Sequence, residues 1–231
     1  MLDFYEDCAV PNLSKNDIKQ LQNVLSKPRF LRYVQACNGN HQQAIDLYRW
    51  NLVLSGNFLI SIHTTVVTLR NGIVEAIAHV YGEEWPWSRA FRRSLPKRQR
   101  KSLRNSCDRV EKKGKGRVVG KVVADMSLYF WQGMLAPRHH AIIWDAHLKT
   151  AFPNIPSGQN TQKNREKLLQ HVIQMRELRN RIAHYEPIFP NNLTQELTNM
   201  EEIVSWRSQV TANWMKTLHD LDSLIASDPR Q

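Results

Sequence analysis

Apolar residues recur along this chain at spacings of three and four, which is the period of an α-helix and not the alternation typical of a β-strand. The longest run at this spacing covers residues 41–81, and another covers 161–184. Proline, glycine and polar clusters divide the rest into shorter segments, over about 14–26, 28–38, 96–113, 118–131, 137–153 and 193–226. The pattern therefore predicts an all-α protein.

Local signals mark several of the predicted helix ends. Ser14 followed by Asp17 has the spacing of a capping box. Gly82 ends the run over 41–81, and the pair Gly56-Asn57 predicts that this run is two helices. Because no repeat, low-complexity segment or linker interrupts the pattern, we expect one domain over residues 1–231, built as a helical bundle with additional helices.

The positive charge is concentrated in one segment. The chain carries 32 Lys and Arg against 21 Asp and Glu, and residues 89–117 hold thirteen of the basic residues but only two acidic ones. The net charge of +11 therefore lies in this stretch, and the rest of the chain is balanced. A basic helical arm over 88–117 favours a surface for a polyanion such as RNA, although a solvated basic helix has the same composition. The candidate RNA contacts are Arg92, Arg93, Lys97, Arg98, Arg100, Lys101, Arg104, Lys112, Lys113, Lys115 and Arg117.

Composition argues against several classes of protein. The acidic start of the chain lacks the basic and apolar regions of a secretory signal. The most apolar stretch, 58–67, is interrupted by Ser61 and His63, so we expect no membrane span. Three scattered cysteines, Cys8, Cys37 and Cys107, indicate neither a disulfide framework nor a metal site. We therefore expect a cytoplasmic protein in a reducing compartment.

Two motifs that suggest ligand binding fail on spacing. The stretch 114–122 resembles a phosphate-binding loop, but Lys115 and Val122 stand where that loop needs Gly and Ser or Thr. His139, His140 and His147 lie close in sequence without the spacing that puts two ligands and a carboxylate on one helix face. The sequence thus predicts no cofactor and no metal site.

The most informative stretch is 175–189. Arg179 falls in an apolar stripe with Met175 and Ile182, so we expect it to be paired or to face an interface or cleft. Asn180 and His184 are four residues apart and share a helix face near the helix end. Histidine transfers protons near neutral pH and arginine stabilises a phosphate, so the pair suits phosphodiester cleavage without a metal. A structural salt bridge and a helix cap would use the same residues.

This stretch resembles the R-x4-6-H motif of HEPN ribonucleases, with Asn180 directly after Arg179 and His184 as the closing histidine. Much of the chain is similar to the Abi-like (abortive-infection) branch of that superfamily. The similar segments are Arg32-Tyr33, 44–55, 69–73, 122–131, Trp144 with Phe152-Pro153, and 179–188. One departure is Tyr185, which stands where many members carry a second histidine.

The resemblance implies a HEPN-type helical fold that forms a homodimer, in which two motifs build one composite cleft. It implies metal-independent RNA cleavage by 2′-OH attack, as in antiphage or toxin-type effectors, with a structured non-coding RNA or a protein antitoxin as a further partner. Arg179, Asn180 and His184 are the implied catalytic residues, and the supporting residues are Tyr185, Glu186, Arg70 and Asn71. The alternative is a HEPN scaffold that holds RNA without cutting it.

Overall fold

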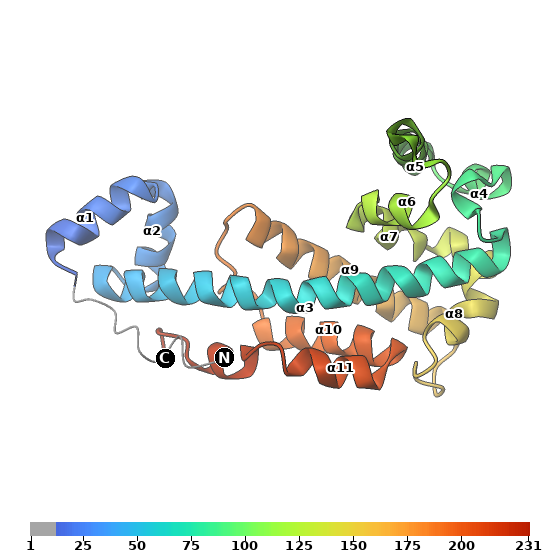
Figure 1. Ribbon diagram of the computed structural model, residues 1–231. Helices are drawn as coiled ribbons and strands as arrows, with labels where there is room; N and C mark the ends of the chain where they lie inside the picture. Colours follow the sequence, from blue (N-terminus) through green and yellow to red (C-terminus); the bar gives the residue numbers. More distant parts are fainter. Residues whose placement is uncertain (1–12) are drawn as a thin grey trace. The chain divides into compact units, whose positions relative to one another are not determined.

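The computed structural model describes residues 13–231, and every regular element in that range is a helix (Figure 1). The all-α prediction is confirmed. The acidic start of the chain and Cys8, which entered the sequence analysis, lie outside the described residues. The side chains of Lys113 and Lys115 are not described either.

The described chain divides into two compact units, which we call unit 1 and unit 2. Unit 1 comprises residues 13–56 and 221–231, and unit 2 comprises 57–220. The helix α3 (His41–Tyr81) contributes residues to both. That the whole chain is one domain stays a prediction.

Unit 1 consists of α1 (Lys15–Val24), α2 (Lys27–Ala36), the first part of α3 and α12 (Leu221–Ala226). The capping box is formed as predicted: Ser14 Oγ accepts from the Asp17 amide at 3.2 Å, and the Ser14 amide donates to the Asp17 carboxylate at 3.0 Å. The Ser14 hydroxyl donates to the Asp17 carboxylate at 2.6 Å, and this bond together with the one from the Ser14 amide lowers the pKa of Asp17. The Trp50 indole donates to the Leu224 carbonyl at 2.6 Å, which ties α12 to the start of α3.

Unit 2 contains the remainder of α3 and the helices between it and α12. In chain order they are η1 (Trp85–Trp87), α4 (Arg89–Ser94), α5 (Lys97–Val110), η2 (Glu111–Lys115), α6 (Val119–Asp125), α7 (Leu128–Met134), η3 (Pro137–His139), η4 (His140–Trp144), α8 (Asp145–Ala151), α9 (Thr161–Ala183), α10 (Leu193–Arg207) and α11 (Gln209–Lys216).

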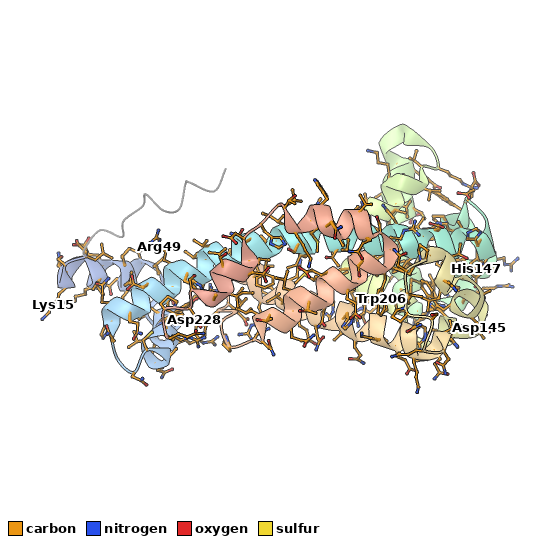
Figure 2. All side chains as sticks on the ribbon, turned by 90° about the horizontal axis from the view of Figure 1, so that it is seen from below. Lys15, Arg49, Asp145, His147, Trp206 and Asp228 are labelled. Carbon is orange, nitrogen blue, oxygen red and sulfur yellow. The ribbon has the colours of Figure 1, made fainter. Side chains whose placement is uncertain are left out.

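The core of unit 2 forms around α9, which packs against α7, α8 and α10. Buried aromatic side chains fill it, including Trp85, Trp131 and Trp144. Trp206 on α10, labelled in Figure 2, lies against His171 of α9 with 6.1 Å between ring centres. In Figure 1, α4 and α5 stand out from unit 2, with α6 and α7 between α5 and α3. That residues 88–117 act as a basic helical arm stays a prediction.

Tertiary packing overrode three of the expected boundaries. Gly56 does not divide α3, because the helix continues to Tyr81 and the flanking Leu54 and Phe58 are fully buried. Their burial outweighs the roughly 1 kcal/mol that a glycine costs inside a helix. The expected helix over 118–131 is instead two helices, α6 and α7, and the Ser127 side chain caps the second one. The segment 193–226 contains three helices, not one or two.

The helix α3 is long and apolar enough to cross a membrane, by length and composition alone, whereas no membrane span was predicted from the sequence. One such helix is weak evidence for a membrane span, because the core helix of a soluble protein passes the same test. In α3, 39% of the apolar window is buried, and Leu69, Ile73 and Ile77 are fully buried. The fold is therefore consistent with a soluble protein.

Candidate functional site

The helix α9 is fixed by its cap and by one apolar face. The Asn160 side chain caps its start, with Oδ1 accepting from the Lys163 amide at 2.8 Å. Met175, Leu178 and Ile182 are buried. Leu178 therefore occupies the stripe position that the sequence analysis gave to Arg179, and the Arg179 side chain is exposed. That placement was wrong because residues 178 and 179 both fit the spacing between 175 and 182, and burial favours the apolar one.

The end of α9 has the hydrogen bonds of a Schellman motif. The Glu186 amide donates to the Arg181 carbonyl at 2.8 Å, and the Tyr185 amide donates to the Ile182 carbonyl at 3.0 Å. Tyr185 occupies the left-handed position of this motif at φ 57°, where glycine is usual, and its side chain is 78% exposed. His184 is the C-cap residue and is also exposed. Three adjacent polar side chains therefore stand at an exposed helix end.

The two arginines of the motif have different environments. The Arg181 guanidinium donates twice to the Pro187 carbonyl, at 3.2 and 2.7 Å, and so holds the turn that follows α9. Arg179 makes one long contact, from Nη1 to Asn180 Oδ1 at 3.5 Å. Arg179 is thus the arginine that is available for a ligand.

Arg179 and Asn180 line a cavity of about 690 Å³ within unit 2, which we call the arginine pocket. Its walls come from one face of α3, from the segment joining α6 to α7, and from α9. The lining residues are Leu59, Ile62, His63, Val66, Val67, Arg70, Met126, Ser127, Leu128, Tyr129, Arg176, Arg179 and Asn180.

The chemistry of this pocket favours an anion. Arg70, Arg176 and Arg179 bring three guanidinium groups to it, and none of the described residues that line it is Asp or Glu. The Nε atoms of Arg70 and Arg176 are buried without a hydrogen-bond partner among the described residues. A phosphate would supply the missing acceptors and offset the mutual repulsion of the three cations.

Three of the aromatic or basic side chains that line the pocket were not among the predicted site residues: His63, Tyr129 and Arg176. His63 lies on α3 two helical turns before Arg70, so both residues share one face of that helix. Arg176 lies on α9 one turn before Asn180. Their spacing from Arg70 and Asn180 was the available signal, but only the packing of α9 near α3 shows that the two sets converge.

The other predicted site residues lie in different places. Arg70 lines the arginine pocket, whereas Asn71 lines a separate cavity of about 430 Å³ together with Glu75 and Arg207. His184, Tyr185 and Glu186 are exposed at the end of α9 and do not line the pocket. His184 follows Asn180 by one helical turn and lies beyond the end of the pocket lining.

The predicted RNA contacts of the basic segment, residues 88–117, fall into two groups. Three of the predicted contacts, Arg92, Arg100 and Arg117, are engaged within the protein, as is Arg109, which was not among the predicted contacts. Arg92 donates to the Pro86 carbonyl at 2.7 Å, Arg100 to the Leu95 carbonyl at 2.9 Å, and Arg109 pairs with Asp125. Arg117 lies 3.5 Å from a carboxylate oxygen of Glu84.

The second group faces solvent. The side chains of Lys97, Lys101 and Arg104 are exposed on one face of α5, opposite the buried Leu103 and Cys107. Arg93, Arg98 and Lys112 are exposed as well. This group is the part of the basic segment that a phosphate backbone can reach.

The histidines considered as metal ligands are dispersed. His139 is buried in unit 2, and burial lowers its pKa to about 4. His147, labelled in Figure 2, stacks on His79 with 5.1 Å between ring centres. Within residues 13–231, no group of three or more His, Cys, Asp or Glu side chains is arranged to hold a metal ion.

Comparisons of the chain with protein-family models, with curated proteins and with solved structures found no match.

Proposed function

We propose that the protein is a metal-independent endoribonuclease of the Abi-like HEPN type, and that the arginine pocket binds the RNA phosphate. The observation that carries the proposal is the meeting of Arg70, Arg176 and Arg179 with Asn180 and His63 in one cavity without a carboxylate. Three guanidinium groups match the charge that builds on a phosphate during cleavage.

In the proposed reaction, the 2′ oxygen bonds to phosphorus while the bond from phosphorus to the 5′ oxygen breaks. One group must take the 2′-OH proton, and another must give a proton to the leaving 5′ oxygen. Imidazole does both near neutral pH, so we assign these two tasks to His63, which lines the arginine pocket, and to His184, which lies beyond the pocket lining of its own chain and would reach the phosphate in the proposed dimer. His63 takes the role that a second histidine at position 185 would have had. The products are a 2′,3′-cyclic phosphate and a 5′-hydroxyl.

Each side chain of the proposed site has its own task. Arg179, with Arg70 and Arg176, holds the phosphate, and Asn180 orients the Arg179 guanidinium through their 3.5 Å contact. Tyr185 and Glu186 follow His184 at the exposed helix end. The step needs no metal ion, because arginine and histidine supply both the positive charge and the proton transfer.

We further propose a cytoplasmic homodimer that acts as an antiphage or toxin-type effector. One chain supplies a single Arg179/His184 pair, and a two-fold contact would bring two pairs into one cleft. The exposed apolar side chains of Leu59 and Ile60, beside the pocket wall on α3, suit such a contact. Light scattering at micromolar concentration is expected to give twice the mass of the chain. A monomeric mass without RNA would refute the dimer.

Cleavage of a labelled RNA by the purified protein in EDTA tests the main proposal. Arg179→Ala and His184→Ala should each lower the rate on the order of 10²-fold or more, and His63→Ala should do the same. Arg138→Ala is the matched control, because Arg138 is exposed in unit 2 and does not line the pocket. RNA with a 2′-deoxy group at the cut site should resist cleavage.

Two results would overturn the mechanism. Full activity of the Arg179→Ala protein would show that the arginine pocket takes no part in cleavage. Loss of activity in EDTA would show that a metal ion takes part.

The second candidate function is an RNA-holding scaffold, paired with a structured RNA or an antitoxin, which the solvent-facing charges of α5 favour. If the protein is such a scaffold, the purified protein should carry one defined RNA species and should not cleave RNA.

A further inference from the structure

One exposed aromatic ring joins the arginine pocket to the basic segment. Tyr129, at the start of α7, lines the pocket and is 46% exposed. The guanidinium carbon of Arg98, on α5, lies 5.2 Å from the centre of its ring, and that of Arg176, on α9, lies 5.7 Å from the same centre. The ring therefore contacts one cation from the basic helix and one from the pocket.

The contact also sets the spacing of the two positive charges. The two guanidinium carbons lie 5.2 Å and 5.7 Å from the same ring centre, so they are no more than about 11 Å apart. The exposed charges of Lys97 and Lys101 continue along the same helix as Arg98. Positive charge thus extends from α5 across Tyr129 to Arg176 in the pocket.

We propose that Tyr129 is a stacking platform for an unpaired RNA base, and that the ligand of the pocket is single-stranded RNA with its backbone on Arg98 and Arg176. The inference rests on the proposed RNA ligand and names its class. The ring is 46% exposed, and an incoming base would stack on it in place of one of the two guanidinium groups, which would then turn to the neighbouring phosphate. An aromatic face beside basic side chains is the usual arrangement in single-strand binding sites. A base inside a duplex is stacked on its neighbours and does not present a face to the ring.

The test measures binding without cleavage. The ligand is a fluorescent 2′-O-methyl oligouridine of about ten nucleotides, which spans one single-strand site and lacks the 2′-OH nucleophile. A chain of abasic tetrahydrofuran phosphates of the same length carries the charge without the bases. The same oligouridine annealed to oligoadenosine is the duplex ligand. Fluorescence anisotropy gives each affinity for the natural protein and for its variants.

Tyr129→Ala should weaken oligouridine binding by about 10-fold or more, as expected for loss of one base stack. It should change the affinity for the abasic chain by less than about twofold, because the phosphate contacts remain. Tyr129→Phe keeps the ring and should bind oligouridine as the natural protein does. The matched control is Trp214→Ala, which removes an exposed aromatic ring of unit 2 that lies outside the pocket.

Equal losses on oligouridine and on the abasic chain would show that Tyr129 only positions the arginines, and would overturn the inference. So would a duplex that binds as tightly as the single strand. The outcome is separate from that of the nuclease proposal, because a protein that binds oligouridine through Tyr129 but never cleaves natural RNA refutes the nuclease alone.

Discussion

Replacing Lys97, Lys101 and Arg104 with alanine removes three positive charges from one face of α5. The three side chains are exposed, and the opposite face of the helix buries Leu103 and Cys107, so the fold should tolerate the change. Arg100 is left in place, because its guanidinium donates to the Leu95 carbonyl at 2.9 Å and supports the turn between α4 and α5.

The magnitude follows from counterion release. Each phosphate contact with a single strand contributes about 0.7 to the slope of log affinity against log salt concentration, so three lost contacts should lower the slope by about 2. Binding should then weaken by about 50-fold at 0.15 M salt but only about fourfold at 0.5 M. Anisotropy titrations of the 2′-O-methyl oligouridine over this range measure both quantities.

The control variant carries Lys15→Ala, Lys19→Ala and Lys27→Ala. It loses the same charge from exposed positions in unit 1 and should keep the natural slope. An unchanged slope in the α5 variant would refute the assignment of the RNA surface to the basic segment. A slope lowered equally by both variants would show that net charge alone governs binding.

Three further predictions concern stability. Burial lowers the pKa of His139 to about 4 in the folded protein. As the pH falls, His139 is therefore protonated in the unfolded chain before it is protonated in the folded one, and the free energy of unfolding drops between about pH 6.5 and 4. Urea unfolding should give a free energy about 2 kcal/mol lower at pH 5 than at pH 7.5, and His139→Leu should remove most of that difference. Gly133→Ala would put a methyl 1.6 Å from Gln99 Nε2, and because the Gln99 side chain is itself buried and has little room to move, the change should destabilise by about 1–3 kcal/mol. Gly120→Ala, with no atom within 4 Å, should not lower the melting temperature. Tyr185 has a left-handed backbone conformation, φ 57°, which glycine adopts without strain and alanine does not. The free energy of unfolding should therefore be about 1 kcal/mol higher for Tyr185→Gly than for Tyr185→Ala, and equal values would refute backbone strain at this position.

The features that the sequence determined by itself are local ones. Helical period, the Ser14 capping box and the stop at Gly82 depend on residues within one or two turns of each other, and all three are present in the fold. The concentration of charge in residues 88–117 is likewise a property of composition. Arg179 and Asn180 were identified because the motif that contains them is contiguous.

Tertiary structure decided what depends on lateral packing. The sequence left 178 and 179 equally suited to the buried stripe of α9, and the neighbouring helices accept Leu178. Hydrogen bonds to backbone carbonyls remove Arg100 and Arg181 from the set of available cations, and no period in the sequence encodes those partners. His63 and Arg176 lie more than a hundred residues apart in the sequence, and they share a cavity only because α3 and α9 both belong to unit 2. The complete site therefore depends on long-range contacts, which local sequence patterns do not contain.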